Sequence, residues 1–89
     1  MPVVSMFYGL IIRMYHFDNL RHKAPNIYMQ YGDQTAVIGI PDGNMLDGEL
    51  KPNKMKLVQA WIEIHQEELM ADWQLAIKGQ NIESIAPLR

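Results

Sequence analysis

The sequence predicts an α+β domain in which an antiparallel sheet of three to four strands is packed on one face by two C-terminal helices. Two observations support this prediction. Short β-type segments separated by turn residues occupy residues 3–50, and one long helical stretch, residues 52–78, follows them. Strands joined by short turns pair antiparallel, and strands that all precede the helices leave those helices on one face of the sheet. The predicted element order is β-β-β-β-α-α.

The composition is that of one globular domain. Hydrophobic residues make up 48 % of the 89 residues, too large a share for a disordered chain. A chain of this length buries roughly 60–65 % of its unfolded surface, so one modest core is expected. We therefore expect a single domain over residues 1–89, with the sheet in 3–50, the helical part in 52–78 and a C-terminal tail in 80–89 that lies back on the domain, in the manner of an edge strand.

The strand segments are recognised by alternation and by β-branched residues. The predicted strands are residues 3–17, 27–31, 35–40 and 45–50. In the first of them Leu10, Ile12 and Met14 alternate with other residues and are expected to face the helices. Arg13 and Tyr15 then lie on the opposite, wetter face. For Arg13 the simplest interpretation is a surface cation packed along its own stem.

The helical stretch carries an apolar stripe that does not run straight. Its second half is rotated by very roughly a fifth of a turn, as judged from helical periodicity. We therefore predict a break near residues 65–68, which also takes Glu68 and Asp72 off the buried side. The stripe includes Ile64 and both tryptophans, Trp61 and Trp73.

Buried tryptophans are the expected outcome of this stripe, because apolar residues at helical spacing usually face a core. The alternative is an aromatic platform on which nucleobases stack, which would need exposed rings. The stripe argues against that alternative.

Neither a metal site nor a cofactor is expected. The chain has no cysteine, and His16, His22 and His65 are not at a spacing typical of metal ligands. His65 falls near the centre of the apolar stripe, so we expect a neutral histidine that forms a hydrogen bond in or at the edge of the core. Glycine-rich phosphate-binding patterns are also absent.

No catalytic residue can be assigned from the sequence. The sequence leaves open whether the protein is an enzyme and leans towards a protein that is not one. The sequence gives the paired carboxylates Glu67–Glu68 and Asp47–Glu49 no environment from which a catalytic role can be argued. What remains is a group of cations, imidazoles and phenols on the first strand, in the loop after it and on the next strand. Such groups bind phosphate and, in metal-free ribonucleases, supply acid, base and charge stabilisation. The candidate nucleic-acid or partner contacts are Arg13, His16, Arg21, His22 and Lys23.

Charge and hydropathy argue against two classes of protein, dedicated nucleic-acid-binding domains and membrane proteins. The net charge is −2, with four acidic and no basic residues in 31–50, and this argues against a dedicated nucleic-acid-binding domain. The apolar stretch 3–12 is too short to span a bilayer and has no basic flank before it. We expect a soluble cytoplasmic protein without membrane contact.

Several segments together resemble a known family. They are residues 2–12 (PVVSMFYGLII) with 14–15, the hairpin 31–50, and residues 55–62 (MKLVQAWI), 65–69 (HQEEL), 73–76 (WQLA) and 85–88 (IAPL). The chain resembles, over nearly its whole length, the small bacterial proteins catalogued as domain of unknown function 4160. Trp61, His65, Glu68 and Trp73 match the family pattern.

The resemblance implies a role in a two-gene, toxin–antitoxin-like system and therefore a small protein partner encoded in the same operon, with RNA or DNA as a further target. Many members carry a Pro-His-x-His motif at the entry to the second strand. Here the matching residues are Pro25-Asn26-Ile27-Tyr28, so both histidines are replaced. This departure weakens any enzymatic interpretation that depends on the histidine pair.

Three functions stay open at this point. The first is a protein-interaction module that pairs with a small operon-encoded protein. The second is a metal-independent RNA-binding protein or ribonuclease that uses the Arg13–Lys23 cluster. The third is a structural homodimer without chemistry, joined through an edge strand.

Overall fold

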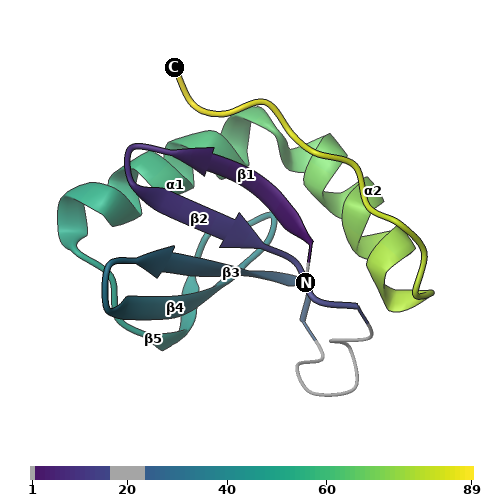
Figure 1. Cartoon of the computed structure of the whole chain (residues 1–89), viewed down its shortest axis with the longest axis horizontal. Coiled ribbons are helices and arrows are strands. Elements are labelled where there is room, and N and C mark those ends of the chain that lie inside the picture. Colours follow the sequence, from purple (N-terminus) through teal and green to yellow (C-terminus); the bar gives the residue numbers. More distant parts are fainter. Residues whose placement is uncertain (1, 17–23) are drawn as a thin grey trace.

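The computed structural model describes residues 2–16 and 24–89, and it confirms the predicted fold class. Within this part of the chain, five antiparallel strands precede two C-terminal helices (Figure 1). The elements are β1 (Val3–Phe7), β2 (Leu10–Arg13), β3 (Asn26–Tyr31), β4 (Gln34–Gly39), β5 (Met45–Gly48), α1 (Pro52–Ile64) and α2 (Gln66–Ile77).

The sheet has one strand more than predicted, because residues 3–17 do not form a single strand. They form a hairpin in which β1 and β2 pair antiparallel across a turn at Tyr8 and Gly9. Both turn residues adopt positive φ, 49° and 81°, which is the backbone form that tight hairpin turns need. The strand order, β1-β2-β3-β4-β5, is the order in the chain, so each strand pairs with its neighbours in sequence.

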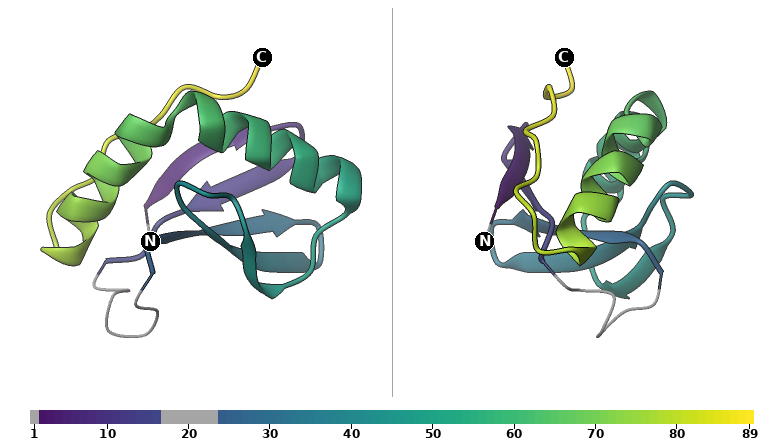
Figure 2. Two further views of the ribbon diagram at one scale, coloured as in Figure 1. Left: turned by 180° about the vertical axis from the view of Figure 1, so that it is seen from behind. Right: turned by 90° about the vertical axis from the view of Figure 1, so that its right-hand side faces the viewer.

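The predicted alternation along β2 is confirmed. Leu10, Ile12 and the following Met14 are buried, whereas Arg13 and Tyr15 are only half-buried on the opposite face. The helices α1 and α2 cover the first of these faces (Figure 2), and no other described element covers the second. The domain therefore has two layers with its core between them. The core side chains come from both layers and from the tail, and include Val4, Leu10, Ile12, Met14, Ile27, Met29, Ile38, Val58, Trp61, Ile62, Leu69 and Ile85.

The predicted break in the helical stretch is confirmed at His65. This residue, with φ −113°, follows the last residue of α1, and its N–H is hydrogen-bonded to the carbonyl oxygens of Trp61 and Ile62. Trp61 and Trp73 are 0 % and 4 % exposed, so the described tryptophans are core residues and offer no exposed stacking platform.

Two side chains of this stretch lie opposite to their predicted positions. Ile64 is 65 % exposed, because it is the last residue of α1 and faces away from the sheet. Asp72 is only 2 % exposed, although the break was expected to take it off the buried side. Glu68, for which the same was expected, is exposed.

The tail after Ile77 lies back on the domain, as predicted, but not as a regular strand. It runs along α2 and then towards β1 (Figure 1). The N–H of Ile85 donates to the carbonyl oxygen of Val4 on β1, with an N···O distance of 2.9 Å. In the described residues neither helix has the length and apolar character needed to cross a bilayer.

Candidate interaction site

Of the residues predicted as nucleic-acid or partner contacts, two lie in the described part of the chain. Arg13 lies on the sheet face opposite the helices, where its Nη1 donates to Oε1 of Gln30 at 2.8 Å. His16 is half-buried just beyond β2, and its Nε2 is enclosed without a hydrogen-bond partner among the described residues. Arg21, His22 and Lys23 lie outside the described residues, so whether the five come together stays a prediction.

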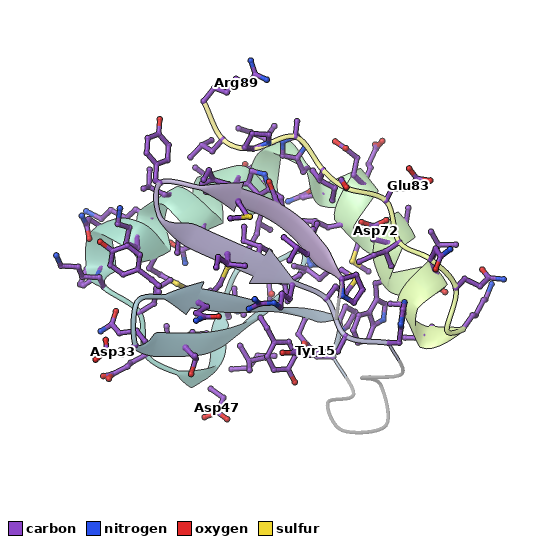
Figure 3. The ribbon with its side chains drawn as sticks, in the orientation of Figure 1. Tyr15, Asp33, Asp47, Asp72, Glu83 and Arg89 are labelled. Atoms are coloured by element: carbon purple, nitrogen blue, oxygen red, sulfur yellow. The ribbon has the colours of Figure 1, made fainter. Side chains whose placement is uncertain are left out.

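Two tyrosines lie beside Arg13 on the same face. The rings of Tyr15 and Tyr28 meet edge to face with 4.3 Å between their centroids. Arg13 is paired in register with Tyr28 across β2 and β3. Both tyrosines are half-buried, so this face presents a cation next to an aromatic pair (Figure 3, Tyr15).

The stretch that replaces the histidine motif has a structural role on β3. Asn26 is buried, with 1 % exposure, and its Nδ2 donates to the carbonyl oxygen of Ala24 at 3.0 Å. An asparagine side chain that bonds to the backbone two residues away orders a turn or loop locally, here just before the strand. The residue thus fixes the start of β3.

His65 behaves as expected for a histidine at the edge of the core. Its side chain is 14 % exposed and packs against Trp61, with 5.5 Å between the ring centroids. Its Nδ1 lies 2.6 Å from Oε1 of Glu68, one turn along α2. This pair ties the break between the helices to the first turn of α2.

A groove lies between α2 and the tail and has a volume of about 330 Å³. Asp72 of α2 and Glu83 of the tail lie next to each other in it (Figure 3). The backbone N–H of Glu83 donates to Oδ1 of Asp72 at 2.9 Å. The other carboxylate oxygen, Oδ2, is buried and has no hydrogen-bond partner among the described residues. The groove is lined by Glu68, Ala71, Asp72, Leu75, Glu83, Ser84 and Ile85.

The electrostatics of this groove are set by carboxylates. Burial raises the pKa of the Asp72 carboxyl above its ordinary value of 3.8, since desolvation disfavours the charged form. The hydrogen bond from the backbone of Glu83 opposes this rise in pKa, and the negative charges of Glu83 and Glu68 add to it. The described residues therefore compensate only part of the negative charge of the Asp72 carboxylate.

Sequence reasoning did not identify Asp72 as a site residue, although an indication was present. An aspartate that falls on the apolar side of a helix needs either a change in helix direction or a polar partner in the core. The structure has both features, because the helix breaks at His65 and Asp72 is nevertheless buried, with a backbone N–H of the tail as its polar partner.

The two edges of the sheet differ. The outer edge of β1 is met by the tail through the hydrogen bond between Ile85 and Val4. The outer edge of β5 pairs with no segment of the described chain. All four residues of β5 are exposed, and Met45 and Leu46 keep 38 % and 45 % of their surface. An open edge with apolar side chains is a template for pairing with another chain.

The described residues offer no metal centre. Within 2–16 and 24–89, no three histidine, aspartate or glutamate side chains lie close enough together to hold a metal ion. The expectation of no cofactor stays a prediction.

Comparison with known proteins identifies a family to which most of the chain matches. The family model described as a domain of unknown function (DUF4160) matches residues 9–74, which is most of the chain, so the chain belongs to this family. No curated protein and no solved structure matches the chain.

Proposed function

We propose that this member of the DUF4160 family is a protein-interaction module of a two-gene, toxin–antitoxin-like system, and that it binds an extended segment of its partner along β5. The observation that carries the proposal is the difference between the two sheet edges. The tail meets the edge of β1, whereas β5 leaves its outer edge unpaired among the described residues. An extended peptide adds to such an edge through main-chain hydrogen bonds, and side-chain contacts give specificity.

Charge favours a basic partner segment over a second copy of the chain. Asp42, Asp47 and Glu49 lie in or beside β5, within a stretch that has no basic residue from 31 to 50. An antiparallel pair of two β5 strands would bring these carboxylates close together, and like charges across a strand pair destabilise it. A segment rich in lysine or arginine would complement the same edge.

The exposed apolar residues of β5 give the partner an anchor. Leu46 and Met45 lie on the open edge strand, where an adaptable methionine suits a surface that adjusts to its ligand. β5 is also short, which limits pairing with unrelated chains. The expected interface therefore combines a few main-chain hydrogen bonds with one apolar contact.

The test is co-expression of the tagged chain with the small protein encoded beside it, followed by affinity measurement on the purified pair. Leu46→Lys should weaken the complex by about tenfold or more, because it removes an apolar contact and adds a charge that repels a basic segment. Ile64→Lys is the matched control, since Ile64 is an exposed isoleucine on α1, and it should bind like the unaltered chain.

Three outcomes would contradict the proposal. They are failure of the two proteins to associate, equal binding by Leu46→Lys and Ile64→Lys, and light scattering that finds a stable homodimer disrupted by Leu46→Lys. The last outcome would favour the structural homodimer.

A second candidate function is RNA binding on the sheet face opposite the helices. The observation that favours it is the position of Arg13 beside the Tyr15–Tyr28 pair on a face that no described element covers. Some RNA-binding domains use the open face of a sheet in this way, where bases stack on aromatic residues and cations pair with phosphates. The half-buried, edge-to-face packing of the two rings leaves less surface for stacking than an open platform does.

Titration with a single-stranded RNA oligonucleotide at two salt concentrations tests this second candidate. RNA binding should weaken steeply with salt, and Arg13→Gln or the double change Arg21→Gln with Lys23→Gln should reduce the affinity and the salt dependence. Unchanged binding in both variants would exclude the Arg13–Lys23 cluster as the RNA contact.

A further inference from the structure

We infer that the groove between α2 and the tail binds an arginine side chain presented by a partner protein. This goes beyond the pairing proposed for β5, because the groove is lined by residues of α2 and the tail, and these segments lie away from β5 (Figure 1). The inference depends on three features of the groove: an unsatisfied buried carboxylate oxygen, further negative charge at the rim, and apolar walls.

The unsatisfied oxygen is Oδ2 of Asp72. The residue is only 2 % exposed, and its Oδ1 is occupied by the backbone N–H of Glu83. Oδ2 has no donor among the described residues. A buried carboxylate oxygen without a partner is unfavourable, and native structures rarely keep one without a reason. A donor that enters the groove from another molecule would satisfy it.

The rim adds charge that only a cation would compensate. Glu83 and Glu68 line the same groove as Asp72. Glu68 already contacts Nδ1 of His65 through its Oε1. All three carboxylates thus keep at least one acceptor oxygen among the described residues, and they come from two different segments, the helix and the tail.

The walls select among cations. Ala71, Leu75 and Ile85 give the groove an apolar lining next to the carboxylates. Arginine combines an aliphatic stem with a planar head, so the stem packs on apolar surface while the head donates several hydrogen bonds. A guanidinium group reaches two acceptors that lie side by side, and it loses less hydration than an ammonium group. A bare metal ion fits less well, because no three ligand side chains gather among the described residues.

The probe for this inference is N-acetyl-arginine methylamide, titrated into the isotopically labelled full chain and followed by the backbone amide shifts. N-acetyl-citrulline methylamide is the control ligand, since it has nearly the same shape without the charge. We expect the arginine probe to shift the amides of Ala71, Asp72, Leu75 and Ser84, which line the groove, and the citrulline probe to leave them in place.

Two variants test the residues. Asp72→Asn should lower the affinity for the arginine probe by about tenfold, because a hydrogen bond to a charged carboxylate becomes a hydrogen bond to a neutral amide. Glu83→Gln should lower that affinity less, and this exposed position keeps its backbone N–H, so the variant gives a second test that leaves the contact with Asp72 in place. Glu67→Gln is the matched control, because Glu67 is an exposed acid of α2 that does not line the groove.

The proposal is overturned if citrulline shifts the same amides equally, if Glu67→Gln weakens binding as much as Glu83→Gln, or if a lysine analogue of the probe binds as tightly as arginine. The titration uses no partner protein, and Leu46→Lys should bind the probe normally. A failure of the β5 proposal is therefore distinguishable from a failure here.

Discussion

The indole N–H of Trp61 donates a hydrogen bond to the carbonyl oxygen of Ala86, with 2.8 Å between the two atoms. A buried tryptophan of α1 thus holds the tail in place. The tail is held twice more within the same four residues, by Asp72 of α2 at Glu83 and by Val4 of β1 at Ile85. The first strand and both helices therefore meet at one short segment.

Trp61→Phe should release this attachment. We expect the free energy of unfolding to fall by about 2 kcal/mol, because the change removes a hydrogen bond and leaves a cavity where a fully buried side chain was. The amide of Ile85 should also exchange faster with solvent. Chemical denaturation and hydrogen exchange measure the two effects.

Trp73→Phe is the control for the cavity, since Trp73 is the other buried tryptophan and the hydrogen bond to Ala86 remains. Equal protection of the Ile85 amide in Trp61→Phe and in the unaltered chain would contradict the holding role of the indole.

Asp72→Asn should stabilise the domain at neutral pH. Asparagine keeps an oxygen for the N–H of Glu83 and removes a charge that is desolvated and repelled by Glu83 and Glu68. The expected gain is on the order of 1 kcal/mol, the scale for a buried polar group with an imperfect partner.

The pH dependence of that gain has a definite sign. The pKa of Asp72 is raised by folding, so its protonated form is favoured in the folded state. The associated stability is fully present below the unfolded value of about 3.8 and is lost as the pH rises through the folded pKa. The advantage of Asp72→Asn should therefore be largest near pH 7 and shrink as the pH falls towards 4. An advantage in urea denaturation that grows with acidity would contradict the raised pKa.

Gly48→Ala should disrupt β5. Gly48 has φ +81°, and an added Cβ would collide with the carbonyl oxygen of Thr35 on β4 and come within 2.9 Å of the Cα of Ala36. We expect the free energy of unfolding to fall by about 3 kcal/mol, or β5 to detach from β4, since the obstructing atoms belong to the backbone. Thermal unfolding measures the loss.

Gly32→Ala separates the collision from the cost of positive φ. Gly32 also has a positive φ, 58°, but nothing lies within 4 Å of the added Cβ. Gly32→Ala should lower the free energy of unfolding by about 1–2 kcal/mol, which is the penalty of an alanine in the left-handed conformation alone. A loss as large as that of Gly48→Ala would mean that backbone strain, and not contact with β4, decides both.

Ile62→Ala and Ile64→Ala test the position of the core on α1. Ile62 is 1 % exposed, so Ile62→Ala should lower the free energy of unfolding by about 2–5 kcal/mol. Ile64 is 65 % exposed and should change stability by less than about 0.5 kcal/mol. Similar losses in the two variants, measured by denaturation, would contradict the orientation of α1.

Periodicity was sufficient to predict the layers of this domain. Alternation identified Leu10, Ile12 and Met14 as inward-facing, and the rotated stripe predicted the break that the structure has at His65. These features are local, because the period of a strand or helix decides which side chains share a face. The hairpin of β1 and β2 was missed because apolar residues continue on both sides of the turn and Tyr8 is not a usual residue at positive φ.

The site could not be predicted to the same extent, because it depends on contacts between distant segments. Asp72 is buried by a tail that follows α2, and no periodic pattern reports which backbone N–H that tail will supply. Ile64 shows the same limit, since its exposure follows from where α1 ends. Arg13 was predicted on the correct face, but its contact with Gln30 required the register of β2 and β3.

The hydrogen bond between Ile85 and Val4 also has a consequence for the order of folding. Each strand of the described residues pairs with a neighbour in sequence, so the sheet can form from local hairpins, which favours rapid folding. The segment that covers the edge of β1 follows α2 in the chain. During synthesis, β1 is therefore made well before the segment that covers it, and until that segment docks the edge of β1 is available to any other chain nearby.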